Sequence, residues 1–271
     1  MAAGKKKHIK SRKSPTGPKG SGRTEVLFGF HSVYEALKAG RRRFEAVLLS
    51  DKRSDPRSEK VMALAKEKRL PIQTLSPEAL DKLAQGGTHQ GIAARVSAFP
   101  MKKAGDVWSD IKDRSAPFFM LVVESIEDTH NLGALIRTAL CADVDYIMIP
   151  KDRSVLPSPG VSRSSAGAME HADIYMVTNV AALLRDLKET GAWVSGLDAG
   201  GKKGLFEADL TGDLVLVIGG EHKGIRQGVR KECDFLLSIP ISGKVNSLNA
   251  SVAGGIAMYE ARRQRDLTKH Q

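Results

Sequence analysis

Three segments in the second half of the chain place polar and charged side chains beside glycine, each directly after an apolar run. Their sequences are EDTHNLGALIRTA (127–139), GGEHKGI (219–225) and SGKVNSLNA (242–250). Asp, Asn and Ser at such positions satisfy free N–H groups at the start of a helix, and glycine lets a ligand or another backbone approach closely. Together the three segments offer the groups of a polar ligand site, with Arg137 and Glu221 as its charged members.

Each segment taken alone also has a simpler interpretation. Asn131 and Asn249 fit ordinary helix caps, Arg137 fits a solvated helix face, and the glycines before Glu221 fit a tight turn with an exposed acid. A shared site is favoured because all three segments follow predicted strands. In parallel sheets, sites form where the C-terminal ends of strands meet.

The second half of the chain alternates predicted strands with predicted helices. The run FFMLVVE (118–124) is typical of a strand covered on both faces. Further strands are expected at 146–149, 174–177, 193–197, 214–218 and 237–241, and helices at 132–142, 161–169, 180–190, 226–233 and about 250–265. This alternation predicts an α/β fold with a mostly parallel sheet and helices on both of its faces.

The first half predicts a smaller α/β unit. Strands are expected at 26–28, 44–49, 71–75 and 92–96. Ser32 and Glu35 form a capping-box pattern for a helix that Gly40 ends, and two further helices are expected to begin at Pro56 and after Ser76. Residues 99–115 break the periodicity. We therefore divide the chain into a basic tail (1–24), a small domain (25–98), a linker (99–115) and a larger domain (116–271).

The charge of the chain is concentrated at its start. The net charge is +11, and residues 1–24 contain eight Lys or Arg and no acid. We expect this tail to be disordered and suited to phosphate contact, although a solubilising extension, a cloning remnant or a transit peptide would have a similar composition. The chain has no apolar run of membrane-spanning length and no secretory signal pattern, so we expect a cytoplasmic protein with reduced cysteines.

Several common site motifs are missing from the sequence. No G-x-G-x-x-G follows a strand, and no G-x-S-x-G elbow occurs. Residues 196–202 read G-x-x-x-x-G-K, but Lys203 stands where a phosphate-binding loop needs Ser or Thr, so we interpret this stretch as a plain loop. No cluster of His, Cys and carboxylates has metal-ligand spacing, and no metal is expected.

Three long motifs resemble those of the SpoU/TrmH-type RNA ribose 2′-O-methyltransferases of the SPOUT superfamily. They are NLGALIRTA (131–139), VIGGEHKGI (217–225) and IPISGKVNSLNASVA (239–253). The likeness runs through 118–265 and extends to SSAGAMEH (164–171). GFHSVYEAL (29–37) and THQGIAARV (88–96) resemble the subgroup that modifies a guanosine in bacterial 23S rRNA. His222 departs from the family, which usually has glycine there, as do Asn246 and Ala250.

The resemblance implies a SPOUT-type catalytic domain whose C-terminal segment is threaded into a trefoil knot. It also implies S-adenosylmethionine as cofactor, a homodimer with the active site near the subunit interface, and a small ribosomal-protein-like N-terminal domain that holds the RNA. The implied activity is 2′-O-methylation of rRNA. Periodicity predicts none of these properties, and the general rarity of threaded chains argues against a knot.

The resemblance also assigns residue roles. The backbone of Gly219, with Ile239 and Leu248, is expected to wall the cofactor, with Gly243 and Ser247 nearby. Arg137 and Asn131 are expected to hold the target nucleotide, and Glu221, Ser247 and Asn249 to complete a polar network. Because arginine stays protonated at neutral pH, we expect Arg137 to orient the hydroxyl and its phosphate rather than act as an unaided base.

Other functions remain open at this stage. A tRNA substrate is the main competitor within the family. A non-catalytic RNA-binding or ribosome-assembly factor would keep the fold without the chemistry, and equilibrium binding of S-adenosylmethionine would distinguish it. A nucleotide-dependent oxidoreductase or kinase is disfavoured because its phosphate-binding motifs are missing.

Overall fold

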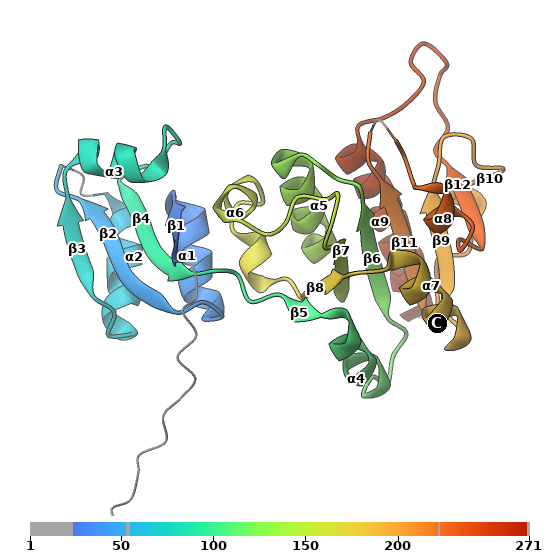
Figure 1. Ribbon diagram of the computed structural model, residues 1–271, viewed down its shortest axis with the longest axis horizontal. Coiled ribbons are helices and arrows are strands. Elements are labelled where there is room, and N and C mark those ends of the chain that lie inside the picture. The colour runs from blue at the N-terminus through green and yellow to red at the C-terminus, as the bar shows by residue number, and fades with distance from the viewer. Residues whose placement is uncertain (1–23, 53–54, 222, 270–271) are drawn as a thin grey trace, which may run out of the picture.

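The chain folds into two α/β units, each built on its own sheet. A computed structural model describes residues 24–52, 55–221 and 223–269, so the predicted basic tail lies outside the described residues except for Thr24. In Figure 1 the two units lie side by side along the long axis of the molecule, and the segment around β5 passes from one to the other. Among the described helices, none has both the length and the apolar character needed to cross a bilayer.

The N-terminal unit is a four-stranded sheet in the order β1-β4-β2-β3. Among its described strands, only β2 and β3 pair in parallel. Odd and even residues of β2 face opposite sides, so Val47 and Leu49 pack in one apolar cluster while Ala46 and Leu48 pack in another. The elements are β1 (Thr24–Phe28), α1 (Phe30–Ala39), β2 (Phe44–Ser50), α2 (Pro56–Glu67), β3 (Ile72–Leu75), α3 (Pro77–Ala84) and β4 (Ile92–Ser97).

The C-terminal unit is an eight-stranded sheet in the order β10-β12-β9-β11-β6-β7-β8-β5, in which every described strand pair is parallel. Its elements are β5 (Lys102–Lys103), η1 (Ala104–Asp106), α4 (Val107–Lys112), β6 (Phe119–Glu124), α5 (Thr129–Cys141), β7 (Tyr146–Pro150), α6 (Pro159–Ser164), η2 (Ala168–His171), β8 (Ile174–Val177), α7 (Val180–Glu189), β9 (Trp193–Leu197), β10 (Lys203–Gly204), η3 (Leu205–Glu207), β11 (Leu214–Gly219), α8 (Gln227–Arg230), β12 (Phe235–Ser238) and α9 (Ala250–Lys269).

The position of strand β6 between two layers of helices explains why its apolar run is unbroken. Phe119, Leu121 and Val123 pack with α5, α6 and α9 on one face of the sheet. Met120 and Val122 pack with α4, α7 and α8 on the other face. Both faces are therefore covered, as the sequence predicts for a parallel sheet with helices on each side.

Four predicted elements differ from the structure. Helix α1 begins at Phe30 with Gly29 as its N-cap, so the predicted capping box at Ser32 is wrong; the side chain of Gln90 accepts the N–H of Phe30 instead. The helix expected at 161–169 is interrupted by the left-handed residues Ala166 and Gly167. The predicted strand 237–241 ends at Ser238, because β9 and β10 offer it no partners beyond that point. Helix α8 is shorter than predicted.

Residues 99–115, the predicted linker, are largely structured. Strand β5 pairs with β8 at the edge of the large sheet, and α4 packs Val107 into the apolar cluster on one face. The connection from β12 to α9 extends beyond the edge of the sheet (Figure 1). The threading of this connection into a knot stays a prediction.

A buried ion pair joins the two units. Arg42, from the N-terminal unit, is fully buried and donates to both oxygens of buried Glu170 in η2, at 2.8 and 3.1 Å. The hydroxyl of Ser162 also donates to Glu170, at 2.7 Å. Gly167 packs so closely on α1 that a Cβ there would lie 2.6 Å from the carbonyl oxygen of His31. The arrangement fixes the N-terminal unit against the start of β8.

This ion pair predicts a large cost for losing one charge. Arg42→Met should lower the free energy of unfolding by roughly 3–5 kcal/mol, because Glu170 would stay buried without its cation. Urea denaturation measures the loss. Arg41 is the matched control: it pairs with Asp173 at 2.9 Å with both side chains about a third exposed, so Arg41→Met should cost less than about 1 kcal/mol. Equal losses for the two variants would mean that burial does not set the cost of breaking the Arg42–Glu170 pair.

Candidate active site

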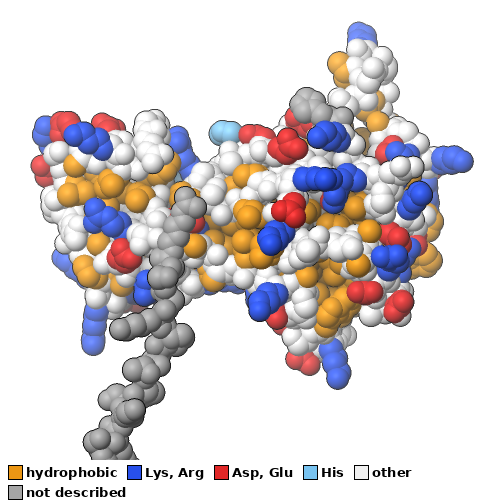
Figure 2. Space-filling model, in the orientation of Figure 1, with side chains coloured by type: hydrophobic (Ala, Val, Ile, Leu, Met, Phe, Trp, Pro, Cys, Tyr) orange, Lys and Arg blue, Asp and Glu red, His pale blue; other side chains and the backbone are white. Residues whose placement is uncertain are grey.

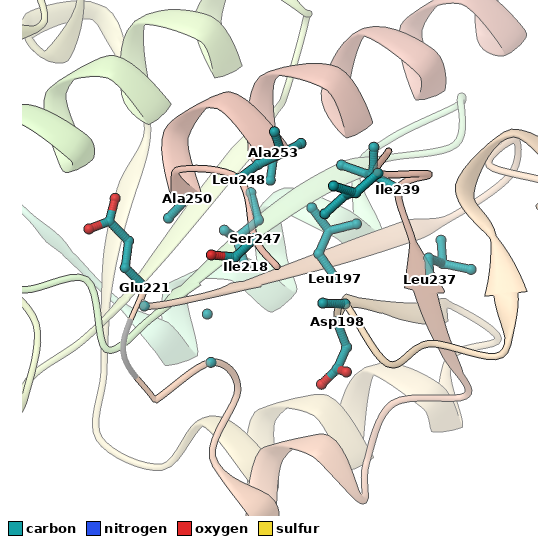
Figure 3. A pocket seen from close by; sticks show the side chains of 15 residues that line it. Leu197, Asp198, Ile218, Glu221, Leu237, Ile239, Ser247, Leu248, Ala250 and Ala253 are labelled. Carbon is teal, nitrogen blue, oxygen red and sulfur yellow. The ribbon is translucent and has the colours of Figure 1, made fainter. Parts of the chain in front are cut away.

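Four neighbouring strands of the large sheet end at one edge and leave an apolar pocket there. The order β12-β9-β11-β6 brings the ends of β9, β11 and β12 together. The cavity measures about 270 Å³. Its lining includes Leu197, Ile218, Leu237, Ile239 and Leu248, and Figure 3 shows these side chains with Glu221 at one end of the pocket and Leu237 at the other. We call this cavity the apolar pocket.

A second cavity adjoins the first. It measures about 290 Å³ and is lined mainly by the β6–α5 loop, including Glu127, Asp128 and Asn131, together with Lys223. Gly220 and Glu221 line both cavities. We call the second cavity the acidic pocket, and Glu221 stands at the boundary between the two.

Hydrogen bonds join the three predicted segments at that boundary. The amide nitrogen of Asn131 donates to Glu221 Oε1 at 3.2 Å, and that of Asn249 donates to Asn131 Oδ1 at 3.0 Å and also to Glu221. We call Asn131, Glu221 and Asn249 the amide–carboxylate cluster. It lies between an apolar cavity and a polar one, which is a suitable place to orient a reacting group.

Helix starts hold the two asparagines in position. Asn249 Oδ1 accepts the backbone N–H groups of Ser251 and Val252 at the first turn of α9, at 3.0 and 3.2 Å. Asp128 caps α5 by accepting the N–H of Asn131 at 2.8 Å. Both asparagines thus lie at capped helix starts, and their amide N–H groups point to Glu221. Asn249 caps its helix as one sequence interpretation suggests, whereas the cap of α5 is Asp128 and not Asn131.

Glycines bring the β11 loop close to its neighbours. A Cβ on Gly219 would lie 2.2 Å from the carbonyl carbon of Gly224, and one on Gly220 would lie 2.2 Å from the carbonyl oxygen of Ser125. On the other side, a Cβ on Gly254 of α9 would meet Ile218 and Leu135 at 2.5 Å. Gly219 and Gly220 therefore tolerate no side chain, because backbone atoms occupy its place, whereas a side chain at Gly254 would require two terminal methyl groups to shift.

The same loop is held by an ion pair. Glu124, the fully buried last residue of β6, accepts from Arg226 at the far end of the loop. This hydrogen bond raises the pKa of the Arg226 guanidinium, so the arginine stays charged. Gly224 N–H in turn donates to Gly220 at 2.8 Å. The loop that carries Glu221 is thus closed both by its own backbone and by a charged pair.

Not all of the predicted cofactor residues line the apolar pocket. Gly219, Ile239, Ser247 and Leu248 all line the apolar pocket. Gly243 lines neither pocket; its φ of 86° serves the turn of the exposed loop before α9. Ser247 is exposed on the pocket wall and, among the described residues, makes no hydrogen bond with its side chain.

Arg137 is not part of this cluster within one chain. It follows Asn131 by six residues, which turns it about 120° away around α5. Its side chain is exposed, lines neither pocket and forms no ion pair with any described residue.

Sequence reasoning missed part of the site. The loop after β9 contributes Leu197, Asp198 and Ala199 to the apolar pocket. Asp198 bonds Arg230 at 2.6 Å and the N–H of Gly200 at 2.8 Å. The sequence signal for this loop was the G-x-x-x-x-G-K stretch at a strand end, which we interpreted as a plain loop.

Among the described residues, no group of three or more His, Cys, Asp or Glu could hold a metal ion.

Comparisons with known proteins identify relatives of both units. Residues 118–259 match the SpoU rRNA methylase family, and residues 26–101 match the family described as RNA 2′-O ribose methyltransferase substrate binding. The 23S rRNA (guanosine-2′-O-)-methyltransferase RlmB of Pseudomonas putida is 37% identical over 247 residues, covering 90% of this chain and 98% of the relative. The putative TrmH family tRNA/rRNA methyltransferase YacO of Bacillus subtilis is 37% identical over 242 residues, covering 89% and 96%.

A solved structure shares the fold of both units. It is the SpoU methyltransferase AviRb of Streptomyces viridochromogenes, crystallised with the cofactor AdoMet. The TM-score is 0.75 at 22% identity, and the match covers 90% of this chain and 91% of that one.

The ion pair at the loop makes a testable prediction. Glu124→Gln should weaken the bond to Arg226 by roughly 1.5–3 kcal/mol and let the loop open, so hydrogen-exchange protection of the Gly224 amide should fall at least about tenfold. Glu127→Gln is the control, since Glu127 is exposed and, within the described chain, forms no ion pair. Protection that is unchanged in Glu124→Gln would show that the pair does not hold the loop.

Proposed function

The chain belongs to the SpoU rRNA methylase family, and from that premise we propose that it methylates the ribose 2′-hydroxyl of a guanosine in 23S rRNA, with S-adenosylmethionine as methyl donor. The observation that carries the proposal is the amide–carboxylate cluster at the boundary of two adjoining pockets. Relatives named for this reaction match about nine tenths of the chain.

The apolar pocket fits the donor. Leucine and isoleucine side chains suit an adenine ring, and the strand-end backbone at Gly219 can approach it without a side chain between. Asp198 at one part of the wall and Glu221 at another offer acceptors for hydroxyl and ammonium groups. The bound cofactor supplies a methyl group already activated by a positive sulfur, so the protein need not activate the donor.

The acidic pocket fits the acceptor nucleotide. Guanine presents N–H donors along its base-pairing edge, and the carboxylates of Glu127 and Asp128 are acceptors for such groups. A guanosine held there would have its ribose beside Glu221 and the two asparagines. We propose that Asn131, Glu221 and Asn249, together with Ser247, orient the 2′-hydroxyl in line with the methyl group.

Arg137 requires a second copy of the chain in this proposal. Next to it, α5 and α9 carry apolar side chains on the surface: Leu140 is 40% exposed, Val252 50% and Tyr259 53%. Val252 and Tyr259 are seven residues apart, so they share one face of α9. We propose that this face pairs with that of a second subunit in a homodimer, and that Arg137 completes the cluster of the partner, where it holds the hydroxyl and its phosphate.

The two units divide the work in this proposal. Residues 25–98 bind the RNA substrate, supported by the match over 26–101, and the larger unit performs the transfer. A guanosine of 23S rRNA as target places the protein in the cytoplasm, where ribosomes are assembled. The space-filling view in Figure 2 shows acidic and basic side chains interspersed on the face drawn, so RNA binding would depend on particular contacts more than on a broad basic surface.

Mapping of methylated nucleotides tests the reaction. Deleting the gene should remove one 2′-O-methylguanosine from 23S rRNA, and the purified protein with S-adenosylmethionine should restore it on rRNA from the deletion strain. Catalytically inactive Glu221→Ala protein is the control for the added protein. A missing methyl group in tRNA, with 23S rRNA unchanged, would instead favour the tRNA activity suggested by the name of the Bacillus subtilis relative.

Subunit mixing tests the role of Arg137. Arg137→Ala and Asn249→Ala should each lower methyl transfer at least about 100-fold. If Arg137 of one subunit completes the cluster of its partner, each mixed dimer contains one intact site of two. Because about half of randomly assorted dimers are mixed, an equal mixture should regain about a quarter of wild-type activity. The same variants mixed without subunit exchange are the control. No recovery after verified exchange would mean that both residues act within one chain, or that Arg137 does not act there.

A further inference from the structure

A third cavity lies where the two units meet, apart from the pockets described above. It measures about 190 Å³. Phe28, Phe30 and His31 line it from the junction of β1 and α1, Thr88 and Gln90 from the loop before β4, and Arg163 from α6 of the larger unit. We call it the interunit pocket. In Figure 1, β1 and α6 face each other across the boundary between the units.

Aromatic rings and guanidinium groups are stacked around this pocket. The ring of Phe30 stacks on Tyr34, with centroids 5.1 Å apart and planes 17° apart. Arg57 lies 5.6 Å from the centroid of Phe30, and Arg163 lies 5.3 Å from that of Phe28. Aromatic rings and arginine planes are the surfaces on which unpaired RNA bases stack.

Within the described chain, neither arginine is neutralised by a carboxylate. Arg57 and Arg163 are exposed and form no ion pair with any residue that the structure describes. By contrast, Arg42, Arg114 and Arg230 each pair with an acid. Each unpaired guanidinium beside an aromatic face can bind a phosphate group with two parallel hydrogen bonds.

The loop before β4 adds polar groups to the pocket. Gln90 is held in a left-handed conformation, with φ of 55°, where its Oε1 accepts the N–H of Phe30 at 3.2 Å. Its amide N–H₂ group makes no hydrogen bond within the described chain, and the hydroxyl of Thr88 is exposed. These donors are available to the edge of a stacked base.

Two helices in contact, α5 and α6, lie between the interunit pocket and the candidate active site. Arg163 precedes Ser164, whose hydroxyl donates to the carbonyl of Thr129 at 2.8 Å. Ser164 also fills the space beside Gly133, where a Cβ would lie 2.0 Å from its Oγ. Thr129 and Gly133 flank Asn131 on α5. One RNA strand can therefore occupy the acidic pocket and reach the interunit pocket across α5 and α6.

We propose that the interunit pocket binds an unpaired nucleotide of the RNA substrate near the one that is methylated. Its base stacks on the Phe28 and Phe30 side of the pocket, Arg163 binds its phosphate at the pocket wall, and Arg57 binds a neighbouring phosphate beside Phe30. The inference rests on the proposed RNA substrate and adds a second point of attachment, which both units must build together.

Charge removal tests the phosphate contact. In the Arg57→Gln/Arg163→Gln protein, affinity for a 23S rRNA fragment containing the methylated guanosine should fall at least about tenfold, with a salt dependence shallower by between one and two in log–log slope. Binding of S-adenosylmethionine and the melting temperature should not change. The matched control is Arg43→Gln/Arg69→Gln. It removes two exposed arginines that form no ion pair with described residues and that follow the C-terminal ends of α1 and α2, whereas Phe30 and Arg57 lie at the N-terminal ends.

Base stacking provides a separate readout. In fragments carrying one 2-aminopurine at each unpaired position around the methylated guanosine, one position should lose fluorescence on binding the wild-type protein. That quenching should weaken in Phe30→Leu, which keeps an apolar side chain but removes the ring. Equal affinity losses in the two double arginine variants, or quenching unaltered by Phe30→Leu in folded protein, would overturn the proposal. Methyl transfer by the wild-type protein in the same assay would show that such a failure concerns the pocket and not the reaction.

Discussion

The parallel pairing of the large sheet is the constraint on which the candidate site depends. Because β12, β9, β11 and β6 run in the same direction, their C-terminal ends meet at one edge, and the loops that follow them are neighbours although they are far apart in sequence. The amide–carboxylate cluster is the result: 90 residues separate Asn131 from Glu221, and 28 separate Glu221 from Asn249. No single segment could form it alone.

Close packing then sets the shape of the site. Gly219 and Gly220 bring the backbone of the β11 loop against its neighbours, and Gly254 does the same for α9. The Glu124–Arg226 pair holds the other end of the loop. At the junction of the two units, the Arg42–Glu170 pair ties the N-terminal unit to the larger one. In the proposal that both units bind one RNA strand, this pair would keep the spacing between them constant.

The sequence predicts the elements well where one strong local pattern decides the outcome. The bounds of β8 and β9 agree with the apolar runs that predict them, and Gly40 ends α1 as expected. The failures occur where a distant residue decides. Gln90 takes over the capping that Ser32 was expected to provide, and β12 ends where its neighbours end, which no local pattern records. The domain bounds and the residue roles stay predictions.

In the candidate site, too, local patterns predict some features and distant residues decide others. Spacing within each segment indicates that Asn131, Glu221 and Asn249 belong to strand ends, but it contains no information about Asp198, whose loop joins the pocket only through the crossing order of the strands. Helical geometry alone turns Arg137 away from Asn131. A motif thus identifies the residues of a family pattern more readily than the direction in which each side chain points.

In the proposed function the apolar pocket binds the methyl donor, and the composition of its wall then limits how the protein could be re-engineered for synthetic cofactors. Enlarging the cavity for a donor with a bulkier transferable group requires trimming side chains, yet Gly219 and Gly220 have none to trim and Ala250 and Ala253 on α9 are already small. Ile218 and Leu237 belong to the buried core, so the bulk that can be trimmed lies mainly in Leu197, Ile239 and Leu248, outside the glycine loop. Redesign of donor scope would therefore begin with these three aliphatic residues and leave the hydrogen-bonded asparagines untouched.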